Sequence, residues 1–168
     1  TWGYAWFVDD VCVIEQPADD LVLNYGVVSH TGTGEEYGRI PKDQVGGLMQ
    51  FGGEVFNFTI KRIPPLIDDI LDFANLSKDD IDFFVLHQAN QYILKNISKR
   101  LGLDDSVLPN RTQTEYGNQN SASIPGTINA YLSSKFASSK LISVFAGFGI
   151  GLSWGACVTS TDSIYCPE

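Results

Sequence analysis

One short apolar run in the middle of the chain limits the fold more than any other feature. Residues 81–86 are Ile-Asp-Phe-Phe-Val-Leu and lie between two segments with apolar residues at helical spacing, 55–73 and 93–101. A run this short, with helical patterns on both sides, is typical of a buried strand, because buried helices are longer. Such alternation of helix and strand predicts a sheet covered by helices.

Both ends of the chain add strand patterns. Residues 11–15 are rich in β-branched side chains and are followed by a second extended run, Leu21 to Ser29, which we expect to pair with them. Leu141 to Phe148 and Leu152 to Thr159 are joined by Gly149-Ile150-Gly151, a pattern typical of a hairpin. We therefore predict an α/β fold with a mixed sheet of about five strands and helices on both faces.

The helical segments carry clear boundary signals. Pro64-Pro65 interrupts the first pattern and predicts a kink or a restart, because proline lacks the backbone donor that a helix interior needs. Gly102 is expected to end the second helix. Residues 110–123 are polar and predict a loop. Residues 124–132 are expected to form a further helix with Pro125 in its first turn.

Composition excludes several classes of function. The chain has 168 residues, 43% of them hydrophobic, and a net charge of −9, which fits one globular domain. This charge argues against a nucleic-acid partner. No apolar run approaches the ~20 residues that span a membrane. The three cysteines share no metal spacing, and we expect a reducing, cytoplasmic location.

Three segments carry residues suited to chemistry. His87 follows the central strand, at the strand end where α/β sheets bind ligands. Asn118 lies in segment 116–123, which is rich in small and polar residues, and its side-chain amide could donate to a carbonyl oxygen. The glycine-rich turn within 145–151 could present N–H groups to an oxyanion. Taken singly, each has a structural explanation: a hydrogen-bonded histidine, a polar turn and a hairpin.

Together, these segments resemble the β-ketoacyl-acyl-carrier-protein synthase III family of thiolase-like condensing enzymes. The resemblance covers roughly residues 10 to 160. It rests on Gly53-Glu54-Val55-Phe56, His87-Gln88-Ala89-Asn90, Lys99-Arg100-Leu101-Gly102, Tyr116-Gly117-Asn118, Ser121-Ala122-Ser123-Ile124-Pro125 and Gly149-Ile150-Gly151-Leu152-Ser153-Trp154-Gly155.

The resemblance implies a two-part enzyme. The family's fold is a five-layer αβαβα sandwich made of two similar halves, of which the amino-terminal half supplies a nucleophilic Cys. Residues 1–168 are then the carboxy-terminal domain without that half, and His87 and Asn118 are the catalytic residues. The implied reaction condenses an acyl group from a coenzyme A thioester with malonyl-acyl carrier protein, in fatty-acid or related acyl-chain biosynthesis. No further cofactor is expected.

It also implies two other sites. Phe148, Gly149, Ile150 and Gly151 correspond to the oxyanion and acyl pocket, with Ile150 where the family often has a glycine. The acyl carrier protein docks on the helix after the catalytic His, which implies a docking role for Gln88, Ala89, Asn90, Gln91, Tyr92, Lys95, Lys99 and Arg100. Tyr92 replaces an arginine of one branch. An ordinary solvated helix explains the basic strip equally well.

The sequence leaves two classes of protein open. The chain is either part of an enzyme or a non-catalytic truncated paralogue that pairs with a complete synthase; a serine hydrolase is disfavoured because no Gly-x-Ser-x-Gly elbow occurs. None of the cysteines precedes a helix as a nucleophile would, so we expect the chain alone to be inactive. The uncharged segment 124–132 predicts a face that associates, most simply as a homodimer.

Overall fold

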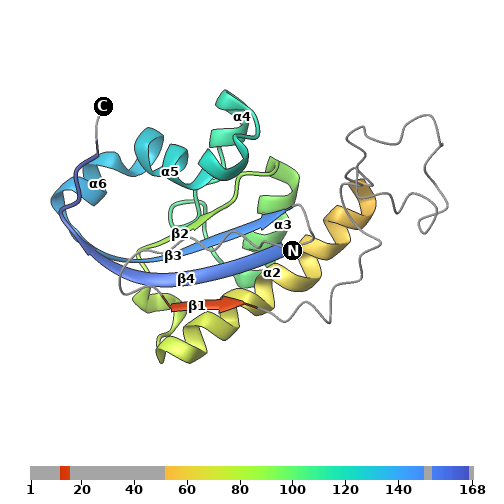
Figure 1. The fold of residues 1–168 in the computed structure, drawn as a ribbon, viewed down its shortest axis with the longest axis horizontal. Coiled ribbons are helices and arrows are strands. Elements are labelled where there is room, and N and C mark those ends of the chain that lie inside the picture. The colour runs from red at the N-terminus through yellow and green to blue at the C-terminus, as the bar shows by residue number, and fades with distance from the viewer. Residues whose placement is uncertain (1–11, 16–51, 150–152, 167–168) are drawn as a thin grey trace.

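The structure is a computed structural model that describes residues 12–15, 52–149 and 153–166. These residues form one sheet with the strand order β1-β4-β3-β2. The strands are β1 (Cys12–Glu15), β2 (Phe83–Leu86), β3 (Lys140–Gly149) and β4 (Ser153–Asp162). Helices lie on both faces of the sheet (Figure 1), which confirms the predicted α/β architecture.

Strand pairing makes the sheet mixed, as expected. β2 runs parallel to β3, whereas β4 is antiparallel to both β3 and β1. The described residues supply four strands and not the predicted five, and the run at 21–29 lies outside them. The structure pairs Cys12–Glu15 with β4, and the expected pairing of this strand with 21–29 stays a prediction. Local patterns cannot reveal such a long-range pairing.

Strand β2, the last in the strand order of the described sheet, separates two hydrophobic cores. Successive side chains of a strand point to opposite faces. Phe84 and Leu86 therefore lie in the larger core, and Val85 lies in the smaller one. All three are fully buried. A strand buried on both faces needs apolar residues throughout, which explains why 81–86 lacks the alternation of an exposed strand.

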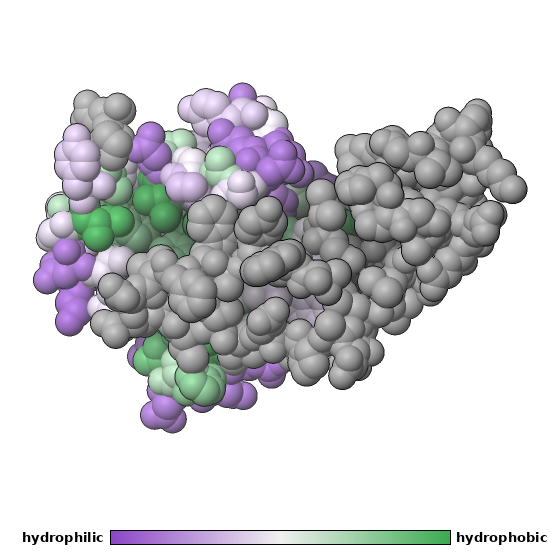
Figure 2. Space-filling model, viewed as in Figure 1, coloured by the Kyte–Doolittle hydropathy of each residue, from purple (hydrophilic) through white to green (hydrophobic). Residues whose placement is uncertain are grey.

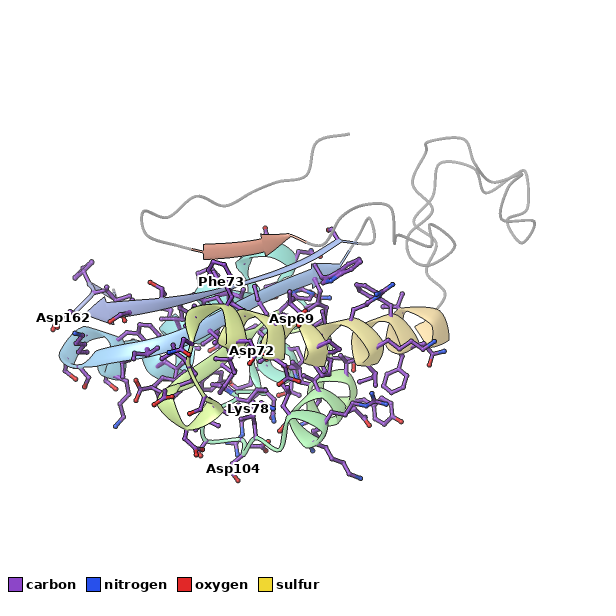
Figure 3. All side chains as sticks on the ribbon, turned by 90° about the horizontal axis from the view of Figure 1, so that it is seen from below. Asp69, Asp72, Phe73, Lys78, Asp104 and Asp162 are labelled. Atoms are coloured by element: carbon purple, nitrogen blue, oxygen red, sulfur yellow. The ribbon has the colours of Figure 1, made fainter. Side chains whose placement is uncertain are left out.

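The larger core lies beneath two long helices, α2 (Gly52–Ala74) and α3 (Gln91–Leu101). Their apolar residues recur at helical spacing and pack toward the sheet, while Asp69, Asp72 and Phe73 lie on the outer side of α2 (Figure 3). The fully buried side chains of these helices include Ile63, Ile67, Ile70, Leu94 and Ile97. This face follows the predicted pattern closely.

The smaller core lies beneath a helical segment longer than predicted. It consists of α5 (Ser123–Thr127), a π-helical turn η5 (Ile128–Leu132) and α6 (Ser133–Ser138), so helix continues past the expected end at Leu132. Phe136 on α6 is fully buried and holds this extension against the sheet. Figure 2 shows apolar surface beside α6, where the helices meet the sheet.

The predicted loop at 110–123 is partly helical. It contains α4 (Thr112–Tyr116) and a 3₁₀ turn, η4 (Asn120–Ala122). Side chains support the first turn of α4, since Gln113 donates to the Asn110 carbonyl and the Thr114 hydroxyl donates to the Arg111 carbonyl. A helix of five residues is too short to show a periodicity, so the loop prediction was wrong here.

The two prolines do not interrupt α2. Pro64 cannot donate to the carbonyl of Ile60, four residues earlier, as another residue would. Instead, Nη1 of Arg100 on α3 donates to this carbonyl at 3.3 Å. A side chain from the neighbouring helix therefore satisfies the acceptor that the proline leaves open. The predicted restart was wrong, because one helix spans 23 residues, whereas the alternative of a kink stays a prediction.

This contact predicts a specific coupling between Pro64 and Arg100. Arg100→Ala should lower the free energy of unfolding by about 1–3 kcal/mol, because the carbonyl of the buried Ile60 loses its donor. In a Pro64→Ala background, the alanine supplies the missing N–H, so the same Arg100→Ala change should cost about 1 kcal/mol less. Urea unfolding of the four variants measures this difference. Equal costs in both backgrounds would show that Arg100 stabilises the helix pair in another way.

Candidate active site

His87 lies directly after β2, at the carboxyl end of the parallel strand pair. Its backbone N–H donates to the Ala146 carbonyl of β3 at 2.8 Å, which extends the ladder by one residue. The imidazole ring lies edge-on to the ring of Phe148, with 5.3 Å between the ring centroids and 88° between the planes. Two of the predicted site residues are thus brought together by neighbouring strands.

Asn118 lies in the bend between α4 and η4. Gly117 precedes it with φ of 72°, a left-handed conformation that glycine adopts without strain. The Asn118 Oδ1 atom accepts a hydrogen bond from the backbone N–H of Asn120 at 2.9 Å. This bond uses the acceptor half of the Asn118 amide. The NH₂ half has no hydrogen-bond partner among the residues that the structure describes.

Asn120 joins the two predicted catalytic residues through its backbone. Its N–H donates to Asn118, and its backbone lies near enough to the imidazole of His87 to influence the pKa of that ring. Asn120 has φ of 51°, in the left-handed region that asparagine tolerates better than most residues. The sequence-based predictions gave Asn120 no role. An asparagine inside a tight polar bend was the available signal.

The environment of His87 favours its neutral form. Burial lowers the pKa of the imidazole, and the hydrogen bond to the backbone of Asn120 opposes this shift in part. A hydrogen bond that raises the pKa of a histidine is one in which the ring donates, so the Asn120 carbonyl is its acceptor. A neutral imidazole has a single N–H donor. That donor is therefore oriented by the same residue that orients Asn118.

The segment that carries Asn118 is anchored at both ends. The hydroxyl of Thr127 on α5 donates to the Ser123 carbonyl at 2.7 Å and lies 2.8 Å from the hydroxyl of Thr112 on α4. Because Thr127 has one proton to donate, Thr112 must be the donor in the second bond. Gly126 leaves room for Gln119, since a Cβ at this position would come within 2.5 Å of the Gln119 Oε1 atom. These contacts hold α4, the bend and α5 together.

The predicted oxyanion and acyl pocket is placed only in part. Phe148 is buried beside His87, and Gly149 ends β3. Ile150 and Gly151 lie outside the described residues. The two strands flanking the turn are in register, with Phe148 opposite Trp154. Trp154 is in turn held by the edge of Phe58 and by the guanidinium of Arg62, both on α2.

One of the predicted docking residues is buried, and the others are exposed or half-buried. Gln88 is 0% exposed, so its assignment to a docking surface was wrong. Asn90 caps α3 by accepting from the Ile93 N–H at 2.8 Å. Tyr92 is 68% exposed and packs on Phe56 with 5.2 Å between ring centroids. The remaining assignments are half-buried at Ala89 and Gln91 and exposed at Lys95, Lys99 and Arg100.

The described cysteines lack the environment of a nucleophile. Cys157 lies in β4, where burial raises the pKa of its thiol and disfavours the reactive thiolate. Cys166 is half-buried at the edge of the smaller core. The side chain of Cys12 lies outside the described residues, although its backbone is part of β1. Neither described thiol is placed at the start of a helix.

Comparison with known proteins gives a consistent family. The family described as 3-Oxoacyl-[acyl-carrier-protein (ACP)] synthase III C terminal matches residues 71–161, more than half of the chain. The β-ketoacyl-[acyl-carrier-protein] synthase III of Porphyra umbilicalis is 37% identical over 119 residues, which are 71% of this chain and 36% of that protein. The corresponding Staphylococcus aureus protein is 36% identical over 135 residues, 78% of this chain and 42% of that one.

A solved structure agrees with these relatives. The 3-oxoacyl-(acyl-carrier protein) synthase of Burkholderia xenovorans superposes with a TM-score of 0.69 and 34% identity, over 79% of this chain and 37% of that one. The chain therefore belongs to the 3-oxoacyl-[acyl-carrier-protein] synthase III family, in its C-terminal part. It spans about a third of the length of the relatives it matches, 36% of the Porphyra protein.

The helices offer no route across a bilayer: within residues 12–15, 52–149 and 153–166, none combines the necessary length with sufficient apolar character.

The lowered pKa of His87 predicts a pH-dependent stability. In the folded chain the pKa of the His87 ring lies below its ordinary value of 6.5. Just below pH 6.5, the unfolded chain therefore binds more protons than the folded chain does. Stability should be complete above pH 6.5 and should fall as the pH drops from there toward the lowered pKa. In a His87→Gln variant this loss should be absent, whereas His30→Gln, at the other histidine of the chain, should retain it. Urea midpoints between pH 7.5 and 5 measure both, and parallel curves for all three proteins would contradict the assignment.

Proposed function

We propose that the complete protein containing this chain condenses an acyl thioester with malonyl-acyl carrier protein, in fatty-acid or related acyl-chain biosynthesis. The observation that carries this proposal is the placement of the His87 ring against Phe148 at the end of β2, next to the bend in which Asn120 fixes the Asn118 amide. It is supported by the family and by relatives named as synthases of this kind. The catalytic Cys would come from the part of those relatives that this chain does not match.

The proposed reaction depends more on hydrogen-bond donors at the enolate oxygen than on proton transfer by a side chain. The bond between the malonyl α-carbon and its carboxylate breaks, CO₂ leaves, and the electron pair forms an enolate on the thioester. The enolate carbon then attacks the acyl group on the Cys, and the thiolate leaves. Two donors at the enolate oxygen stabilise the charge that develops there. The NH₂ group of Asn118 and the N–H of His87 are suited to this role, and the reaction as proposed requires only the two thioester substrates.

The hydrogen bond of His87 to Asn120 bears on this role. The neutral imidazole has one N–H, and we propose that the Asn120 carbonyl accepts it before substrate binds. A thioester oxygen must compete with this carbonyl. We propose that the enolate oxygen takes over the N–H as its negative charge develops, because hydrogen bonds to charged acceptors are stronger. Such a bond is stronger in the transition state than in the ground state and therefore accelerates the reaction.

An acidic carrier protein would dock on α3. Tyr92, Lys95 and Lys99 are exposed on this helix, and Lys61 is exposed on the adjacent helix α2. The chain has a net charge of −9, so a local concentration of basic residues stands out against its surroundings. Long-range attraction would favour an acidic partner at this surface. Arg100 is less available to such a partner, because its guanidinium donates a hydrogen bond to the Ile60 carbonyl.

The arrangement favours an enzyme over a non-catalytic paralogue. A subunit with a purely structural role needs the sheet and its cores, but it has no use for an exposed Asn118 amide whose acceptor half is fixed by Asn120. The half-buried His87 likewise faces Phe148 without filling a core position.

Malonyl-dependent CO₂ release tests the proposed catalytic residues. In the complete synthase, His87→Ala and Asn118→Ala should each lower this release by about 10²–10³-fold, because each removes one donor from the enolate oxygen. Asn57→Ala, at an exposed position of α2, should leave it unchanged. Release of labelled CO₂ from malonyl-acyl carrier protein measures all three. Activity close to that of the unaltered enzyme in both site variants would remove both residues from the mechanism.

The 168-residue chain by itself is proposed to pair with a second copy. Its α5–η5 surface presents the half-buried apolar side chains Ile124, Ile128 and Tyr131, together with the exposed Pro125 and Ala130. Covering ~400 Å² of apolar surface is worth about 10 kcal/mol at ~25 cal/mol per Å², before the cost of association. A two-fold dimer would bury this face twice.

Sedimentation at micromolar concentration tests this pairing. The chain should sediment as a dimer, and Ala130→Asp should shift it to monomer, because a charge in an apolar interface loses its hydration. Phe73→Asp is the control: Phe73 is 66% exposed on α2, across the sheet from α5, so its change should leave the dimer intact. A monomeric unaltered chain would refute the pairing.

A further inference from the structure

The side chain of Gln88 makes an unusual set of hydrogen bonds beside His87. It is fully buried, and its Nε2 atom donates to the Leu86 carbonyl at 3.1 Å and to the Pro109 carbonyl at 3.0 Å. Its Oε1 atom is buried without a hydrogen-bond partner among the described residues. Both partners of Nε2 are carbonyls, and only the NH₂ group can donate to them. The orientation of the amide is therefore determined by its partners.

The backbone cannot make this connection itself. The N–H of His87 bonds to Ala146 on β3, so by the alternation of a parallel ladder the carbonyl of Leu86 points to the other edge of β2. The segment after α3 passes along that edge, where the Phe84 N–H donates to the Val107 carbonyl at 2.7 Å. Pro109 follows in this segment and has no N–H to offer β2. The Gln88 amide places two donors between two carbonyls at this point.

The two bonds act on both catalytic residues. The bond from Gln88 to Leu86 spans two residues and closes the bend of the chain at His87. The bond to Pro109 holds the segment that continues through Asn110 into α4, and α4 leads to Gly117 and Asn118. One buried amide thus connects the end of the strand that carries His87 with the start of the helix that leads to Asn118.

Stability alone does not account for a glutamine at this position. The buried Oε1 atom loses its hydration without gaining a partner, which costs free energy. A side chain of similar size without polar atoms would avoid that cost, although it would leave the two carbonyls without this donor. From this geometry we infer that Gln88 is a positioning residue, which holds His87 and the Asn118 segment in the relative placement that the condensation needs. This inference rests on the proposed function.

The first test separates two steps of the complete synthase. Gln88→Met keeps the volume of the side chain and removes both donors. It should lower kcat for malonyl decarboxylation by at least tenfold with little change in KM, because a small misplacement of catalytic groups costs up to about 10²-fold in rate. Acylation of the catalytic Cys by the coenzyme A thioester should stay within about twofold, since that step does not use the His87 and Asn118 donors.

A matched variant controls for lost stability. Ser98 is buried on α3, and its hydroxyl donates to the Leu103 carbonyl at 2.6 Å, away from His87. Ser98→Ala also removes a buried side-chain bond to a carbonyl, and it should lower the thermal midpoint without changing decarboxylation. Equal loss of acylation and decarboxylation in Gln88→Met, or unchanged decarboxylation, would overturn the positioning role. If Gln88→Met does not fold, Gln88→Glu takes its place, since this near-isostere cannot donate to both carbonyls.

A second measurement on the 168-residue chain is independent of the proposed reaction. The chain has two histidines, so the imidazole ¹⁵N signals of His87 can be assigned by comparison with a His30→Gln variant. Gln88→Met should change the tautomer balance of His87 and move its pKa back toward 6.5, whereas Ser98→Ala should change neither. Unchanged His87 signals in Gln88→Met would overturn the inference. If the unaltered complete protein showed no decarboxylase activity, the proposed function would be refuted. The His87 ¹⁵N signals would then still test whether Gln88 positions His87.

Discussion

The candidate site depends on the backbone of Asn120 more than on any other group. Its N–H donates to Oδ1 of Asn118 and so orients the acceptor half of that amide. Its backbone also acts on the imidazole of His87, which follows strand β2, and opposes in part the lowering of the pKa of that ring. Asn120 serves both from a left-handed conformation, so the geometry of the bend decides the geometry of the site. The Thr112–Thr127 hydroxyl pair holds the helices on either side of that bend.

The rest of the fold delivers His87 to this bend. β2 is buried on both faces, and its two cores leave the strand no freedom to slip by one residue without exchanging Phe84 and Val85 between them. The position of His87 along the sheet is therefore fixed, and its ring lies beside Phe148 on the neighbouring strand β3. Polar side chains supply donors where the backbone cannot: Arg100 to the carbonyl freed by Pro64, and Gln88 to the carbonyl of Pro109.

Much of this fold could be predicted, because periodicity reports burial directly. The apolar spacing on α2 and α3, the doubly buried strand at 83–86 and the terminal hairpin all follow local pattern. Two features of the fold could not be predicted, for one shared reason: the uninterrupted helix α2 and the pairing of the first strand with β4. The continuous α2 depends on Arg100, which lies 40 residues beyond Ile60, and the pairing of β1 with β4 joins the two ends of the described chain. No window of sequence contains either contact.

The sequence alone was enough to identify His87, Asn118 and Phe148 as candidate site residues, because their chemical character is known from residue type without a fold. The sequence alone also determined the charge that disfavours a nucleic-acid partner. Only the tertiary structure decided which groups act together. It placed Gln88 inside the protein and not on a docking surface, and it made Asn120 the common neighbour of His87 and Asn118. The physical reason is that a hydrogen bond depends on distance and direction between atoms that chain order leaves unspecified, and packing of the two cores against the sheet supplies both.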